Sequence, residues 1–276
     1  MTTSTAPSAS AGDRNLVRAR PSGFLGDLIT IAKRALRSIP REPETFVPAL
    51  FVPTFFFIVN VGALQNLTEG FPGNEGFDYR AFQLPTAIIF AVTGVSRAPG
   101  LVTDIQSGYF DRLLLSPARR LPLLLGLMVA DLVLVIGLCI PVLILGFVFG
   151  VSFGTGVLGV LVFILIGALW GVAYTGLPYA IALKTANPGA VGASFILFFP
   201  FAFLTGSTVP LDQLSGWLRT VARYNPITHI LESMRSLTGD TWEWAEIGKG
   251  LLAILIVAVV SQGLALAALR GRLDRG

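Results

Sequence analysis

The stretch from Leu121 to Gly150, LPLLLGLMVADLVLVIGLCIPVLILGFVFG, decides the class of fold. It contains one charged side chain, Asp131, and is otherwise almost wholly apolar. A helix of about 20 apolar residues is long enough to cross the hydrocarbon core of a bilayer. The stretch therefore predicts a membrane-spanning helix, with enough length to tilt or to extend beyond the bilayer.

The composition of the whole chain agrees with residence in a membrane. Of its 276 residues, 53% are hydrophobic and 13% are charged, whereas soluble domains carry about 25% charged residues. The apolar segments lack the alternation that is typical of membrane β-strands. Cys139 is the only cysteine, which excludes a disulfide within the chain. The sequence predicts an all-α integral membrane protein.

Six segments are long and apolar enough to be candidate membrane spans, within a transmembrane domain that covers residues 45–276. Several of them contain proline, which membrane helices tolerate and which often marks a kink. The lipid bilayer is thus an expected partner of the chain. The candidate spans are residues 46–65, 82–102, 121–150, 157–183, 189–207 and 249–269.

The distribution of lysine and arginine predicts the orientation. With the N-terminus in the cytoplasm, fifteen of the twenty lysines and arginines fall on the inner side and five on the outer side. Inner loops of membrane proteins carry such an excess. We therefore expect a multi-pass protein of the plasma or inner cell membrane with both termini cytoplasmic. Residues 1–20 lack the apolar run of a signal peptide and are expected to form a disordered cytoplasmic tail.

Residues 21–40 are expected to form an amphipathic helix on the inner membrane surface. Apolar residues fall on one helical stripe, and Lys33, Arg34 and Arg37 lie on the opposite face. A basic polar face favours contact with anionic lipid headgroups. Two interpretations remain open and are compatible: a membrane anchor, and a helix that also touches a cytoplasmic partner.

The loop from Asp104 to Arg120 carries charges at both ends and lies between two candidate spans. Tyr109 and Phe110 provide hydrophobic anchors, and Asp111 and Arg112 provide charged groups. These features favour a short amphipathic helix that docks onto a soluble partner. A plain connecting loop is the alternative.

The segment between the fifth and sixth candidate spans predicts two short helices on the outer side. Residues 211–221 place their leucines, Trp217 and Val221 on one stripe. Asn225 is a good helix N-cap and Pro226 suits a first helical position, so a second helix is expected over Ile227–Leu237. Such helices would line or close the outer mouth of a pathway.

The sequence contains no phosphate-binding loop and no glycine-rich nucleotide motif. His229 is the only histidine, which excludes a metal site built on histidines and cysteines. A Ser/His/Asp hydrolase is conceivable only through His229, and a structural or interfacial histidine is the favoured interpretation. We therefore expect a non-enzymatic chain that binds no metal or cofactor itself and no nucleic acid.

Asp131 is an exception among the apolar spans. It lies about ten residues, or roughly 15 Å, from the inner end of the third span. A carboxylate at this depth is costly and should face protein or water, and Arg97 is a candidate partner. It serves either as a polar contact between helices or as an element that lines a pathway or senses a cation. Because spans two and five carry small polar residues, the candidate pathway set is Thr93, Ser96, Asp131, Thr205 and Ser207. Small residues equally serve helix packing.

Two stretches resemble the permease subunit of type-2 ABC transporters, in the drug-exporter branch that includes daunorubicin-resistance permeases. Asp104–Pro117 resembles the family's cytoplasmic pattern acid-x-x-x-Gly-x-x-x-x-Leu-x-x-(Thr/Ser)-Pro, although the first acid is usually Glu. Gly206–Leu211, followed by Asn225–His229, resembles its Gly-x-x-x-Pro-Leu and Asn-Pro-(aliphatic)-Thr patterns.

The resemblance implies a permease that dimerises with itself or with a second permease, and that is driven by two copies of a cytoplasmic ATPase holding ATP and Mg. It implies outward transport of a hydrophobic or amphiphilic drug, lipid or secondary metabolite. A polysaccharide or glycolipid exporter, a secondary carrier or channel without an ATPase, and a non-transporting assembly or sensor protein remain alternatives. Residues 104–116 would be the coupling helix, with the contact residues Asp104, Ser107, Gly108, Tyr109, Phe110, Asp111, Arg112 and Leu115.

Overall fold

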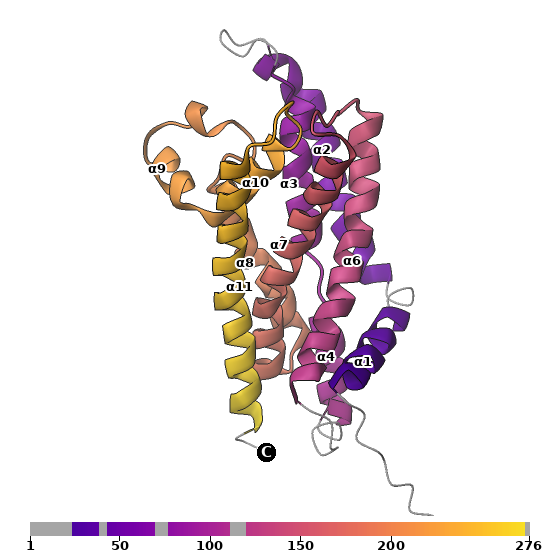
Figure 1. Cartoon of the computed structure of the whole chain (residues 1–276). Coiled ribbons are helices and arrows are strands. Elements are labelled where there is room, and N and C mark those ends of the chain that lie inside the picture. The colour runs from indigo at the N-terminus through magenta and orange to yellow at the C-terminus, as the bar shows by residue number, and fades with distance from the viewer. Residues whose placement is uncertain (1–23, 39–42, 70–76, 111–119, 274–276) are drawn as a thin grey trace, which may run out of the picture.

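The computed structural model describes residues 24–38, 43–69, 77–110 and 120–273. These residues form ten α-helices and one 3₁₀ turn, without a strand, which confirms the expected all-α fold (Figure 1). The expected tail over residues 1–20 lies outside the described residues. The helices are α1 (Phe24–Ser38), α2 (Pro43–Glu69), α3 (Tyr79–Thr93), α4 (Ala98–Gln106), α6 (Arg120–Val148), α7 (Gly156–Thr185), α8 (Pro188–Phe203), α9 (Gly216–Tyr224), α10 (Pro226–Ser236) and α11 (Trp244–Leu273), with the 3₁₀ turn η2 at Leu211–Gln213.

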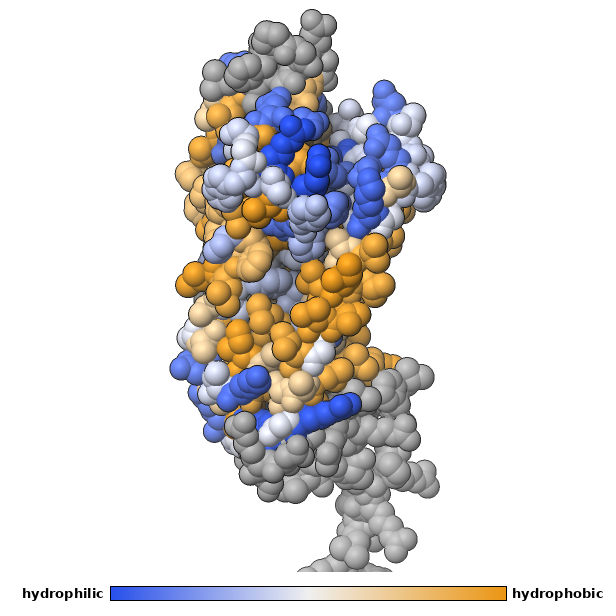
Figure 2. All heavy atoms as spheres, turned by 90° about the vertical axis from the view of Figure 1, so that its left-hand side faces the viewer, coloured by the Kyte–Doolittle hydropathy of each residue, from blue (hydrophilic) through white to orange (hydrophobic). Residues whose placement is uncertain are grey.

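Five helical stretches of the described residues are long and apolar enough to cross a membrane. They lie in α2, in α3 together with α4, in α6, in α7 and in α11. The face seen in Figure 2 carries an apolar belt between two hydrophilic ends, as expected for a protein surrounded by lipid. The chain is therefore a multi-pass membrane protein.

The fifth expected span is shorter in the structure than the sequence predicts. Helix α8 has 16 residues and ends at Phe203, which is less than the roughly 20 residues that span a bilayer. The Asn225 side chain donates from Nδ2 to the carbonyls of Phe201 (2.7 Å) and Leu204 (3.0 Å), and so satisfies the end of α8. The same side chain accepts from the Ile227 N–H and caps α10, as predicted. The count of six spans stays a prediction.

The second expected span is broken. Helix α3 ends at Thr93 and α4 begins at Ala98, although the whole stretch Tyr79–Gln106 is apolar enough to cross a membrane. Pro99 lacks the N–H that would donate to Val95, and Gly94 has low helix propensity. The predicted single span over residues 82–102 did not include this break.

Helix α7 lies in the middle of the bundle and packs against α3, α4, α6, α8 and α11. Helices α1 and α4 and the last turn of α11 lie at one end, which we call the α4 end, whereas α9 and α10 lie at the other, the α10 end (Figure 1). Helix α1 is amphipathic as expected, with Ala32 and Ala35 buried and Lys33, Arg34 and Arg37 exposed.

Candidate functional site

At the α4 end, Arg34 of α1 joins the last turn of α4 and the loop that follows it. The Arg34 guanidinium donates from Nη2 to Oδ1 of Asp104 (2.8 Å) and from Nη1 to Oδ2 (3.3 Å). Its carbon also lies 4.1 Å from the centroid of the Tyr109 ring. A forked guanidinium–carboxylate pair fixes geometry as well as charge, and the stacked ring adds a cation–π contact. We call these three residues the Arg34 clamp.

The loop that follows α4 is held on both sides. Gly108 has a φ of 67°, a left-handed conformation that glycine adopts without strain. The Phe110 side chain is buried in an apolar cluster with residues of α4, α6, α7, α8 and α11, and the Arg272 guanidinium carbon lies 6.0 Å from its ring centroid. Ser107 donates to the Asp104 carbonyl (3.1 Å). The predicted contact residues Asp111, Arg112 and Leu115 lie outside the described residues.

Asp131 lies at mid-depth and is fully buried. Its Oδ1 accepts from the main-chain N–H of Arg97 (2.7 Å), and its Oδ2 accepts from the Tyr179 hydroxyl (2.5 Å). Arg97 is thus the partner that the sequence predicts, although the main chain makes the hydrogen bond. Tyr179 was missed because no local pattern links two residues on different helices.

The other candidate pathway residues are separated in the structure. Thr93 donates to the Ile89 carbonyl (2.6 Å) and accepts from Trp170 Nε1 (2.8 Å) inside the bundle. The hydroxyl of Ser96 accepts from the Ala98 N–H (3.4 Å) at the break. The buried Thr205 donates to the Ala202 carbonyl (2.5 Å), whereas Ser207 lines a recess nearer the α10 end.

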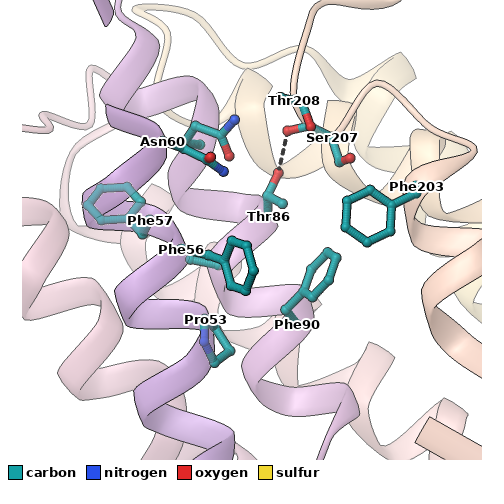
Figure 3. A pocket seen from close by; sticks show the side chains of 11 residues that line it. Pro53, Phe56, Phe57, Asn60, Thr86, Phe90, Phe203, Ser207 and Thr208 are labelled. Atoms are coloured by element: carbon teal, nitrogen blue, oxygen red, sulfur yellow. Dashed lines mark hydrogen bonds between the residues drawn. The ribbon is translucent and has the colours of Figure 1, made fainter. Parts of the chain in front are cut away.

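This recess lies between α2, α3 and the segment that follows α8, and has a volume of about 40 Å³. Figure 3 shows polar side chains on one side, with Thr86 donating to the Ser207 carbonyl (3.1 Å), and the rings of Phe56, Phe90 and Phe203 on the other. No lining residue is charged. The lining residues are Pro53, Phe56, Phe57, Asn60, Gln83, Thr86, Ala87, Phe90, Phe203, Ser207 and Thr208.

Arg235 of α10 holds the wall of the recess in place. Its Nε donates to the Phe82 carbonyl (3.1 Å), Nη2 to the Gly206 carbonyl (2.8 Å) and Nη1 to Oε1 of Glu232 (2.9 Å). Its guanidinium carbon also lies 3.5 Å from the Phe82 ring centroid. Burial lowers the pKa of Arg235 to about 10, so the side chain remains charged at neutral pH.

The fold defines a multi-pass, all-helical membrane protein, and comparison with known proteins gives its family. The sequence model of the ABC-2 type transporter family matches residues 27–238, which is more than half of the chain. The chain therefore belongs to the ABC-2 type transporter family and is a transport permease.

Similar proteins include drug-resistance permeases. The daunorubicin resistance ABC transporter permease protein DrrB1 of Streptomyces coeruleorubidus is 26% identical over 238 residues, covering 84% of this chain and 79% of its own. The probable doxorubicin resistance ABC transporter permease protein DrrC of Mycobacterium tuberculosis is 26% identical over 232 residues, covering 83% and 82%. The putative transport permease ycf38 of Cyanophora paradoxa is 25% identical over 257 residues, covering 86% and 87%.

Proposed function

We propose that this chain is the membrane subunit of an ATP-driven exporter that moves a hydrophobic or amphiphilic substrate outward. A separate cytoplasmic ATPase binds ATP and Mg, and the chain itself is not catalytic. The observation that carries the proposal is the Arg34 clamp, which makes one docking surface from the interface helix and the loop after α4. The α4 end then faces the cytoplasm, in agreement with the excess of lysine and arginine expected there.

The clamp suits a role in force transfer more than a role in stability. The side chains of Arg34 and Asp104 are 53% and 24% exposed, and exposed ion pairs contribute about 0–1 kcal/mol to stability. Their geometry nevertheless ties α1, which packs on α6, to α4, which packs on α7. A force that an ATPase applies to either α1 or α4 is therefore transmitted to both α6 and α7.

The recess favours an uncharged amphiphilic group as the part of the substrate that it contacts. Aromatic rings form one wall and neutral hydrogen-bonding groups form the other. Its volume of about 40 Å³ is far below the roughly 300–1,000 Å³ of drug-sized pockets. It therefore holds one edge of a substrate, and a second permease copy would complete the site. Only 17% of the apolar span of helix α2 is buried, so this helix exposes a wide apolar face to which that copy could bind.

Reversing one charge of the clamp should uncouple transport. In inverted membrane vesicles that contain the chain and its ATPase, we expect Arg34→Asp or Asp104→Arg to lower ATP-dependent daunorubicin uptake about tenfold, a typical coupling between sites. The double swap should restore much of the uptake because it recreates the ion pair. Lys33→Asp, the same charge change one residue away, is the matched control. Parent-like uptake by both single variants would contradict the proposed role of the clamp.

A further inference from the structure

The described part of the bundle contains two large apolar cores and a small apolar cluster of Val95, Leu134 and Leu138. The break between α3 and α4 falls between the two large cores. The outer core, toward the α10 end, includes apolar residues from positions 84–92 of α3 and 163–173 of α7. The inner core, toward the α4 end, includes Phe110 and apolar residues from positions 98–105 of α4 and 179–183 of α7. Helices α6, α7, α8 and α11 pass from one large core to the other without interruption, whereas the α3–α4 stretch is interrupted at residues 94–97.

Polar contacts join the long helices near the boundary between the two large cores. Asp131 of α6 accepts from Tyr179 of α7. Six and seven residues earlier in α7, Ser261 of α11 donates to the Ala173 carbonyl, and the half-buried Gln262 donates from Nε2 to the Val172 carbonyl (2.8 Å). These contacts fasten α6 to α7 and α7 to α11.

Asp131 caps α4 from another helix. The first N–H groups of a helix lack partners within it, and the N-cap residue Arg97 makes no side-chain cap of its own. The Asp131 carboxylate accepts from the Arg97 N–H, while Tyr179 holds the other carboxylate oxygen. Negative charge is favourable at a helix N-terminus. The contact is thus made to main chain at the break, so it fixes where α4 begins relative to α6 and α7.

A buried carboxylate in a membrane span is costly, and simple packing would be served better by an apolar side chain. We propose that Asp131 is a positioning residue for coupling: it fixes α4 and the loop after it to α6 and α7. Any change in the angle between α3 and α4 then occurs at residues 94–97. A push on the loop then moves the inner core as a unit and shifts α3, which carries Gln83, Thr86 and Phe90 of the recess. The effect of Asp131 on transport rests on the proposed function, whereas its role in positioning α4 does not.

The position of α4 can be measured without an ATPase or a substrate. Spin labels are placed at the exposed Thr103 of α4 and the exposed Leu158 at the far end of α7, in a Cys139→Ala background. The protein is reconstituted in lipid nanodiscs and diluted with unlabelled protein, and pulsed electron resonance gives the distance distribution. Asp131→Ala should broaden and shift the distribution. Asp131→Asn should keep the parent distribution, because the amide oxygen still accepts from the Arg97 N–H.

Two further variants keep this test decisive. Thr175→Val removes a buried hydroxyl whose hydrogen bond stays within α7, and should leave the distribution unchanged. Tyr179→Phe frees one carboxylate oxygen and should give intermediate broadening, which is the result to measure if Asp131→Ala fails to insert. Parent-like distributions in an inserted Asp131→Ala protein, or in Tyr179→Phe where Asp131→Ala does not insert, would overturn the proposal.

A second readout separates positioning from mere stability. In vesicles that contain the ATPase, Asp131→Ala should lower the substrate moved per ATP hydrolysed about tenfold, and Asp131→Asn should retain the parent ratio. A lower amount of inserted protein with an unchanged ratio would mean a structural role and would overturn the proposal. If no ATPase binds the parent chain, the proposed function fails while the distance measurement still decides the role of Asp131.

Discussion

Gly176→Ala should push α7 and α11 apart and sharply reduce the yield of folded protein. A Cβ atom at this position would lie 2.4 Å from the carbonyl carbon of Ser261 and 2.6 Å from the main-chain nitrogen of Gln262. Because both are main-chain atoms, no side chain can turn away to make room. The hydrogen bonds from Ser261 and Gln262 to α7 depend on this close approach, as is common where small residues line membrane-helix contacts.

The expected loss of stability is about 3 kcal/mol, from overpacking together with weakened interhelical hydrogen bonds. The measurement is thermal unfolding of detergent-purified protein, with the yield of the monodisperse fraction as a second readout. Gly137→Ala in α6 is the matched control, because a Cβ atom there meets nothing within 4 Å. Equal midpoints of thermal unfolding for Gly176→Ala and Gly137→Ala would show that α7 and α11 are not packed this closely.

Arg235→Met should be the other strongly destabilising change. It removes the guanidinium donor from the carbonyls of Phe82 and Gly206 and the partner of Glu232. Removing one member of a buried charged network costs about 3–5 kcal/mol, and we expect the lower end because Glu232 is 35% exposed. Arg235→Lys should recover only part of the loss, since lysine lacks the planar fork.

The same thermal unfolding measurement tests this expectation. Arg223→Met is the matched control: it removes the same charge from an exposed position of α9. If Arg235→Met unfolds at the midpoint of Arg223→Met, the segment after α8 does not depend on this guanidinium.

Local features of the sequence predicted much of the fold. Runs of apolar residues predicted the long helices, and helical periodicity predicted α1. The Asn225–Pro226 pair predicted the start of α10, because an N-cap and a first-turn proline act within a few residues. The predicted single helix over residues 211–221 is divided in the structure into η2 and α9, with Leu214 in an extended conformation between them.

The contacts that build the candidate sites could not be predicted in the same way. Arg34 and Asp104 are 70 residues apart, and Asp131 and Tyr179 are 48 apart, so only the packing of helices reveals that they meet. The break at residues 94–97 depends on Asp131 as well as on Gly94 and Pro99, and apolar composition alone does not show it. The recess was missed because α2 contributes Phe56 and Asn60, which a search of spans two and five does not include.

The most direct measurement is purification of the chain from native membranes in mild detergent, followed by identification of the proteins that accompany it. We predict a stoichiometric soluble protein with a phosphate-binding loop, which Arg34→Asp releases and the Arg34→Asp/Asp104→Arg double swap retains. A chain that purifies alone as a stable, homogeneous protein, and that transports daunorubicin in liposomes without ATP, would contradict an ATP-driven permease and identify a secondary carrier or channel.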